Sequence, residues 1–94
     1  MKNEITLEFD KVISGLAGYD YGKEVFEQQV KEKIDYNNKI IIIFPETIKR
    51  IASSFIQGFF EEIVEEIGIC GVEKNIEIRS SKLDMKQTII NNLM

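Results

Sequence analysis

The stretch I-I-I-I-F-P, from Ile40 to Pro45, decides the fold class. Four successive β-branched residues and a phenylalanine, closed by the only proline of the chain, are typical of a central strand that is buried on both faces of its sheet. Such sheets contain parallel strand pairs, which are connected by crossover helices. The stretch therefore predicts an α/β domain with the strand Ile40–Phe44 at its centre.

The segment after this strand predicts the clearest helix of the chain. It is expected to begin at Ser53 or Ser54 and to end before Gly68, a residue suited to the position after a helix. Its apolar residues recur at helical spacing and include Phe59 and Phe60, which are expected in the core, with a docking patch as the alternative. The opposite face carries the four glutamates Glu61, Glu62, Glu65 and Glu66.

The remaining periodicities complete a strand–helix alternation. The expected elements are an edge strand at Glu4–Phe9, a loop at Asp10–Tyr19 with a weaker strand signal at Lys11–Ser14, a helix capped by Asp20 and reaching about Ile34, a turn at Asn37 and Asn38, a loop at Gly68–Gly71, a strand at Glu73–Arg79 and a last helix capped by Ser81. This order predicts one small α/β sandwich over residues 1–94, with a mixed sheet of three to four strands and about three helices.

Charge and composition narrow the classes of function. The net charge is −4 and the basic residues are scattered, with Lys49 and Arg50 as the only adjacent pair, so neither nucleic acid nor an anionic membrane is an expected partner. Cys70 is the only cysteine, and the charged residues near the N-terminus interrupt any signal-peptide core. The longest apolar run is too short to cross a bilayer. These features predict a cytoplasmic protein.

The residues of common catalytic sites are missing from the sequence. It has no histidine and a single cysteine, which removes histidine-based triads and thiolate metal sites. It also lacks the glycine-rich motifs that bind phosphates of nucleotides. We therefore expect no catalytic residues, no cofactor and no metal, and a protein that is not an enzyme.

The adjacent serines Ser53 and Ser54 support two interpretations. In the first, Ser54 caps the helix and forms a capping box with Gln57, three residues later. In the second, one serine accepts a phosphate, because a helix N-terminus offers free N–H groups and a favourable dipole to an anion. Local chemistry favours the capping interpretation.

The pattern from Ile40 to Glu62, a buried strand, a short loop and the step I-A-S-S-F into an amphipathic helix, resembles the STAS-like domain family of unknown function. Gly22, which opens the preceding helix, and the strand-and-helix unit from Ile76 to Leu93 resemble that family as well. The resemblance covers roughly residues 5–93, and its motifs are short. It implies a STAS-like fold and a regulatory protein.

Through this family the chain is more distantly similar to the STAS domains of anti-sigma factor antagonists, which bind an ATPase-fold kinase and are phosphorylated on a serine. By position, the resemblance makes Ser53 the phosphoacceptor and Ser54 its neighbour. The sequence departs from the antagonist motif, because Ala52 replaces an aspartate and Phe55 replaces a glycine. The implied function is partner switching through the loop Glu46–Ala52 and the start of the next helix. The candidate partner-binding residues are Lys49, Arg50, Ala52, Ser53, Gln57 and Glu61.

Other interpretations stay open at this point. The chain could be a constitutive inhibitor or adaptor that binds a larger enzyme through its acidic helix face without phosphorylation. It could bind a nucleotide or another small molecule with the loop Gly15–Gly22. A homodimer could form through the edge strand Glu4–Phe9. Cys70 is expected to be a small buried or half-buried residue, with redox chemistry as the alternative, and Gly22 is expected to allow close backbone packing.

Overall fold

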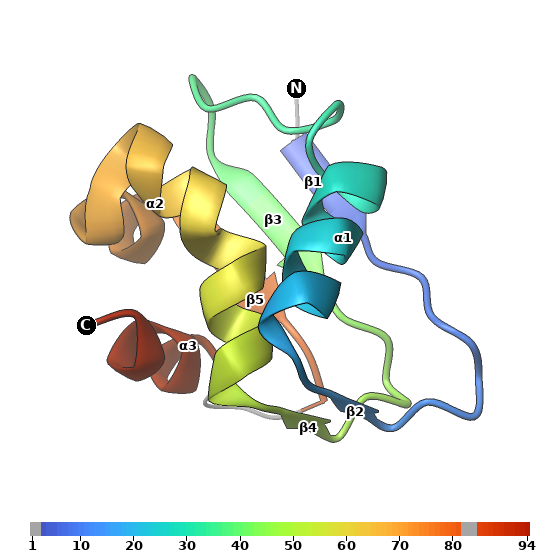
Figure 1. Ribbon diagram of the computed structural model, residues 1–94. Coiled ribbons are helices and arrows are strands. Elements are labelled where there is room, and N and C mark those ends of the chain that lie inside the picture. Colours follow the sequence, from blue (N-terminus) through green and yellow to red (C-terminus); the bar gives the residue numbers. More distant parts are fainter. Residues whose placement is uncertain (1–2, 82–84) are drawn as a thin grey trace.

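The computed structural model describes residues 3–81 and 85–94 and confirms a small α/β domain with three helices. Figure 1 shows its elements along the chain. They are β1 (Asn3–Thr6), β2 (Gly15–Leu16), α1 (Tyr19–Gln29), β3 (Ile40–Ile43), β4 (Arg50–Ile51), α2 (Ser53–Asn75), β5 (Ile76–Arg79) and α3 (Met85–Leu93).

The strands form two separate parallel sheets. The main sheet has the order β1-β3-β5, and β2 pairs with β4 in a second sheet. The expected central place of β3 and the edge place of β1 are confirmed. The expected mixed sheet is not found, since every pairing among the described residues is parallel. The reason is that α1 and α2 each carry the chain back across the sheet, so successive main-sheet strands run in the same direction.

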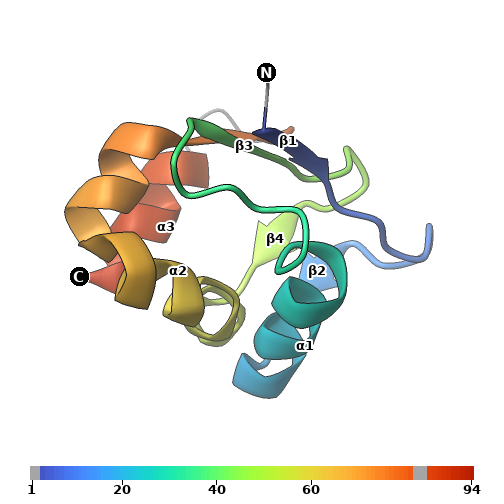
Figure 2. The same cartoon turned by 90° about the horizontal axis from the view of Figure 1, so that it is seen from above.

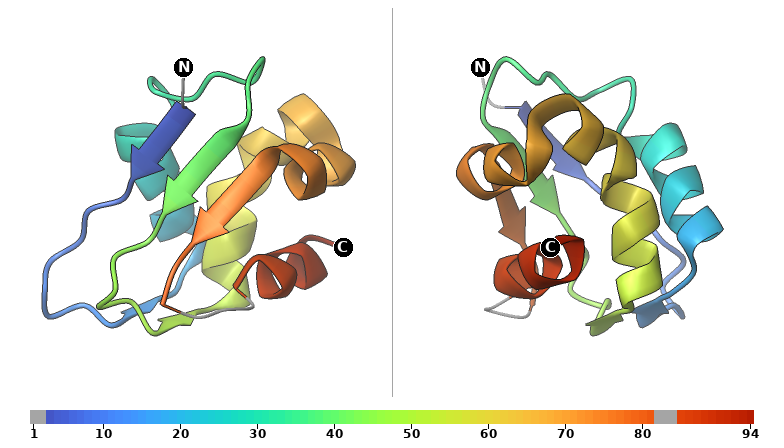
Figure 3. Two further views of the ribbon diagram at one scale, coloured as in Figure 1. Left: turned by 180° about the vertical axis from the view of Figure 1, so that it is seen from behind. Right: turned by 60° about the vertical axis from the view of Figure 1, so that its left-hand side comes forward.

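All three helices cover the same face of the main sheet, and its other face is open (Figure 2; Figure 3, left). Ile40 and Ile42 point into the core, whereas Ile41 and Ile43 alternate to the open face. Ile41 is nevertheless only 6% exposed. The prediction of a strand shielded on both faces is therefore correct for Ile41, although no helix provides the shield.

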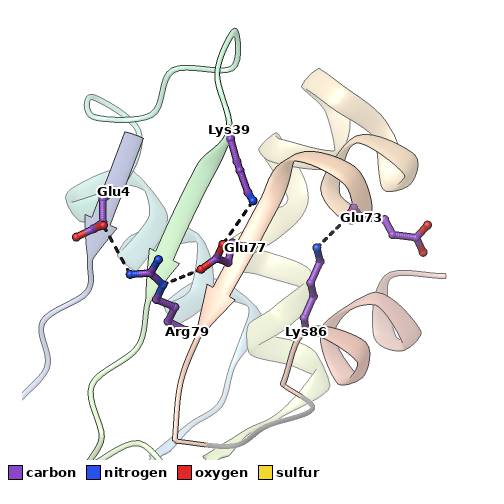
Figure 4. Close-up of polar contacts among 6 residues, drawn as sticks. All are labelled: Glu4, Lys39, Glu73, Glu77, Arg79 and Lys86. Atoms are coloured by element: carbon purple, nitrogen blue, oxygen red, sulfur yellow. Dashed lines mark hydrogen bonds and ion pairs between the residues drawn. The ribbon is translucent and has the colours of Figure 1, made fainter. Parts of the chain in front are cut away.

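Charged side chains of the main sheet lie together on the open face (Figure 4). Glu4 and Glu77 are the neighbours of Ile41 in the strand register. Arg79 Nε lies 2.7 Å from Glu77 Oε2, and Arg79 Nη1 lies 3.8 Å from Glu4 Oε2. Lys39 Nζ lies 3.5 Å from Glu77 Oε1. The hydrogen bond from Arg79 lowers the pKa of Glu77. Exposed pairs of this kind stabilise a fold only slightly, but they keep the open face polar.

Helix α2 is longer than predicted. Gly68 has φ 71° and ψ 171°, which interrupts the helix where the sequence predicted its end. The chain then resumes helical geometry up to Asn75, so the expected loop Gly68–Gly71 is wrong and β5 begins only at Ile76. Burial of Val72 against the core fixes this second segment and leaves Cys70 exposed, contrary to the buried or half-buried position expected for it.

Helix α1 begins earlier and ends earlier than predicted. Gly18, with φ 104°, is the N-cap, and Asp20 lies in the first turn without capping it. The helix ends at Gln29, because Val30 is fully buried and turns the chain towards Ile34.

The other predicted boundaries shift by a few residues. Strand β1 ends at Thr6 and not at Phe9, and the short strand expected at Lys11–Ser14 lies at Gly15–Leu16. Helix α3 begins among the described residues at Met85. The Ser81 hydroxyl donates to the carbonyl of Ile48, and residues 82–84, where the predicted helix start falls, lie outside the described residues.

Helices α1 and α2 cross with their backbones in contact. Gly22 faces the carbonyl of Phe55, and a Cβ added to it would lie 2.7 Å from the Phe59 nitrogen. Gly58 faces the Tyr19 carbonyl in the same way. The close packing expected at Gly22 is thus confirmed, while the reciprocal role of Gly58 was not predicted.

An aromatic cluster lies beside this crossing. Phe59 is fully buried, stacks on Phe55 and contacts Phe26, Phe44 and Phe60 edge-on or tilted. Phe60 is buried as well. Both residues are therefore core residues, as the sequence predicted, and neither belongs to an exposed docking patch.

Candidate functional site

The predicted phosphoacceptor and its basic neighbours lie together at one end of the molecule, where β4 leads into α2 (Figure 1). Lys49, Arg50 and Ser53 are exposed, and Ala52 is half-buried. Buried Ile48 anchors the segment from inside, and the amides of Lys49 and Arg50 both donate to the Ser14 carbonyl, at 2.7 and 3.2 Å. We call Lys49, Arg50, Ala52 and Ser53 the Ser53 surface.

The start of α2 has no side-chain cap. Ala52 is the N-cap residue in an extended conformation, which makes Ser53 and Ser54 the first two residues of the helix. The expected capping box between Ser54 and Gln57 is therefore wrong. A capping residue must precede the first helical turn, and Ser54 already lies within that turn, so it cannot cap the helix.

The two serines have different roles. The Ser54 hydroxyl is half-buried and accepts a hydrogen bond of 3.0 Å from the N–H of Gly18, at the start of α1. Ser53 is exposed, and its hydroxyl makes no hydrogen bond within the described chain. Ser54 thus connects α1 to α2, whereas the hydroxyl of Ser53 is accessible.

Substituting the two serines separately should reveal this difference. Ser54→Ala is expected to lower the free energy of unfolding by about 1 kcal/mol, because it leaves the Gly18 N–H without its acceptor. Ser53→Ala is the matched control and should change stability by less than about 0.5 kcal/mol. Urea denaturation of both variants measures the effect. Equal stabilities would contradict the role assigned to Ser54.

An open hollow of about 620 Å³ adjoins the Ser53 surface. It is lined by β2, β4 and the residues that follow them, namely Gly15, Leu16, Ala17, Arg50, Ile51 and Ala52. The pattern of residues did not predict this hollow. The two strands that line it have only two residues each, which is too short for an alternating pattern of apolar residues to be recognised in the sequence.

Gln57 and Glu61, the two predicted partner-binding residues further along α2, differ in whether their side chains are free. Gln57 is exposed one turn after Ser53. Glu61 instead contacts α1: the Tyr19 hydroxyl donates to its carboxylate, and Lys23 Nζ lies 3.0 Å from it. The structure therefore brings Gln57 to the Ser53 surface and commits Glu61 to the contact between the helices.

The acidic face of α2 is only partly free. Glu62 faces Lys31, which lies just beyond the end of α1, with Nζ and Oε1 3.6 Å apart. Glu65 and Glu66 are exposed and have no ion pair among the described residues. All four glutamates thus remain in contact with solvent, but Glu61 and Glu62 are half-buried and paired, whereas Glu65 and Glu66 are exposed.

The contacts of Glu61 make stability depend on pH. The hydrogen bonds from Tyr19 and Lys23 lower the pKa of Glu61 below its ordinary value of 4.5. The same carboxylate raises the pKa values of Tyr19 and Lys23. A carboxyl group with a lowered folded-state pKa stabilises the protein above its unfolded-state pKa, and this contribution disappears as the pH falls through the folded-state pKa.

We therefore expect the free energy of unfolding to fall as the pH drops below about 4.5, with Glu61 contributing to the slope. In Glu61→Gln the slope should be smaller. Glu65→Gln, one turn further on, is the control and should keep the slope of the original protein. Chemical denaturation at a series of pH values measures this, and identical slopes in the original protein and Glu61→Gln would contradict the assignment.

The segment Gly15–Gly22, which the sequence offered as a small-molecule site, contributes Gly15, Leu16 and Ala17 to the hollow beside the Ser53 surface. The segment Gly15–Gly22 is a strand followed by the first turn of α1, and buried Gly22 faces α2. Within residues 3–81 and 85–94, no three His, Cys, Asp or Glu side chains converge on a metal site. In the same part of the chain, no helix has the length and apolar character needed to cross a bilayer.

Comparisons with protein-family models, with curated proteins and with solved structures each found no match to this chain. The functional interpretation therefore depends on the geometry of the Ser53 surface and on the residues around it.

Proposed function

We propose that this protein is a STAS-like regulatory module that binds a partner protein through the Ser53 surface and releases or exchanges it when Ser53 is phosphorylated. The observation that carries the proposal is the contrast between the two serines. Ser53 presents a free hydroxyl three residues after exposed Arg50 and four after exposed Lys49, while the Ser54 hydroxyl is bound to Gly18. The module binds and carries out no catalysis of its own.

The chemistry of the helix start supports a phosphate at Ser53. The uncapped first turn of α2 presents backbone N–H groups and the positive end of the helix dipole. A phosphate adds roughly −1.5 to −2 charges there. That charge would offset Lys49 and Arg50, so a partner attracted to these cations would lose its electrostatic attraction. An ATPase-fold kinase is the kind of partner that the proposed family relationship implies.

Peptide-level mass spectrometry on the protein recovered from its own host tests the proposal. We expect a population that carries one phosphate, located on Ser53. Ser53→Ala should lose the phosphate, and Ser54→Ala, which removes the half-buried hydroxyl that accepts from Gly18, should keep it. A phosphate on Ser54 alone, or serines that stay unmodified under all growth conditions, would contradict the switch.

A second candidate function is a constitutive inhibitor or adaptor that binds through the acidic face of α2. It is favoured by Glu65 and Glu66, which are exposed side by side without ion pairs among the described residues. Replacing both with glutamine leaves the contacts of Glu61 with α1 and of Glu62 with Lys31 intact. Loss of partner binding in this double variant, together with normal binding in Ser53→Glu, would favour the constitutive binder over the switch.

A further inference from the structure

The outer edge of β2 presents unpaired backbone groups. In the parallel ladder with β4, the Arg50 N–H donates to the Ser14 carbonyl and the Ala52 N–H donates to the Leu16 carbonyl. Because backbone groups alternate in direction along a strand, the N–H and C=O of Gly15 point away from β4. No contact within the described chain occupies them. Gly15 and Ala17 are also exposed, and neither carries a bulky side chain across the edge.

Just beyond the end of β1, one outward-facing backbone position is covered by a side chain. Just beyond β1, the Gln29 side chain accepts from the Glu8 N–H at 2.7 Å and donates to the Glu8 carbonyl at 2.8 Å. This carboxamide occupies the backbone groups that another strand would use. Exposed edges are normally protected by such devices. The outward N–H and C=O of Gly15 have no such cover within the described chain, so the edge of β2 is a candidate docking place for an extended peptide.

Arg50 determines the charge of this edge. Its Nε lies 4.0 Å from the position of a Cβ on Gly15, so the guanidinium lies against the strand. Arg50 forms no ion pair within the described residues. A side chain on a strand added beside Gly15 would meet this cation, and a carboxylate is its natural bidentate partner.

We propose that the outer edge of β2 accepts an extended acidic segment of the partner protein as an additional strand, with a carboxylate of that segment on Arg50. This mode, in which backbone hydrogen bonds give affinity and side chains give specificity, is known as β-augmentation. The inference rests on the proposed function, since it names the chemistry of the partner at the Ser53 surface. A second copy of the chain is a poorer occupant, because symmetric pairing of two β2 edges would bring two Arg50 side chains together.

A synthetic peptide tests this edge directly. The probe is the capped hexapeptide Val-Glu-Val-Glu-Val-Thr, and its neutral control is Val-Gln-Val-Gln-Val-Thr. In ¹H–¹⁵N spectra of the labelled protein, the acidic peptide should shift the amides of Gly15 and Ala17 and the Arg50 Nε–H, with a Kd on the order of 1 mM. The neutral peptide should bind about tenfold more weakly. No shift at Gly15 and Ala17, or equal shifts with both peptides, would overturn the proposal.

Two variants separate the backbone contribution from the charge. Gly15→Pro removes the outward N–H but not the Ser14 and Leu16 groups that pair with β4, and it should abolish the binding of the acidic peptide; the amide shifts of Arg50 and Ala52 check that the ladder is retained. Arg50→Glu should lose the acidic peptide and gain Val-Lys-Val-Lys-Val-Thr. If Arg50→Glu still prefers the acidic peptide, the assigned role of Arg50 is wrong.

The same variants distinguish this inference from the proposed function. One possible result is that the partner from the host still binds Gly15→Pro and Arg50→Glu but no longer binds Ser53→Glu. This result would support the Ser53 switch and contradict the addition of a strand at β2. If Ser53→Glu binds the partner normally but Gly15→Pro does not, the edge would be confirmed as the docking place without the switch.

Discussion

Gly58→Ala is expected to destabilise the protein by about 3 kcal/mol or more, an effect at the upper end of those caused by overpacking. A methyl group on Gly58 would overlap the Tyr19 carbonyl oxygen and lie 2.8 Å from its carbon. Both atoms belong to the backbone, so no side-chain rotation can make room. The helices α1 and α2 would have to separate, and that would open the core beside Phe55 and Phe59.

Urea denaturation of Gly58→Ala measures this effect, and Gly15→Ala provides the matched control. A methyl group on Gly15 would meet nothing closer than 3.8 Å, so the control should retain nearly full stability. Gly22→Ala should behave like Gly58→Ala, because the Phe55 carbonyl blocks it. Equal stability of Gly58→Ala and Gly15→Ala would contradict the close crossing of the two helices.

Phe59→Ala is expected to cost about 3–5 kcal/mol. Phe59 is fully buried, and its ring contacts those of Phe26, Phe44, Phe55 and Phe60. Removing the ring leaves a cavity between α1, α2 and β3 that rigid aromatic neighbours fill poorly. The midpoint of thermal unfolding should fall accordingly.

Val12→Ala is the control for this substitution, since it also removes apolar atoms. Val12 is 86% exposed in the loop before β2, so the change should lie within about 0.5 kcal/mol. A small effect of Phe59→Ala, similar to that of Val12→Ala, would show that the aromatic cluster is not the centre of the core.

Features encoded by local periodicity could be predicted from the sequence. The apolar run Ile40–Phe44 indicated the central strand, and the helical spacing from Phe55 to Ile67 indicated the buried face of α2. Gly68 correctly indicated an interruption of the helix. Its resumption could not be predicted, because it depends on the burial of Val72 against a core that only the folded chain assembles.

The features missed by the sequence analysis depend on contacts between distant segments. Gly58 resembles an unfavourable residue within a helix until the Tyr19 carbonyl is placed against it. The spacing of Ser54 and Gln57 resembles a capping box, yet Ser54 accepts from Gly18, which is 36 residues away in the chain. The parallel direction of all pairings and the edge of β2 likewise follow from topology. The exposed positions of Ser53, Lys49 and Arg50, in contrast, could be predicted from the polarity of these residues alone.

Photo-crosslinking in the native host tests the central claim, that a partner protein docks at the Ser53 surface, most directly. Gln57→p-benzoylphenylalanine places the crosslinker on an exposed position one turn from Ser53. Asn38→p-benzoylphenylalanine places it on an exposed residue of the connection between α1 and β3, which lies at the opposite end of the molecule from β4 (Figure 1). We predict one crosslinked protein from position 57 and none from position 38, with the product lost in Ser53→Glu. Equal crosslinking from both positions, or a product that persists in Ser53→Glu, would contradict a phosphorylation-controlled partner site at Ser53.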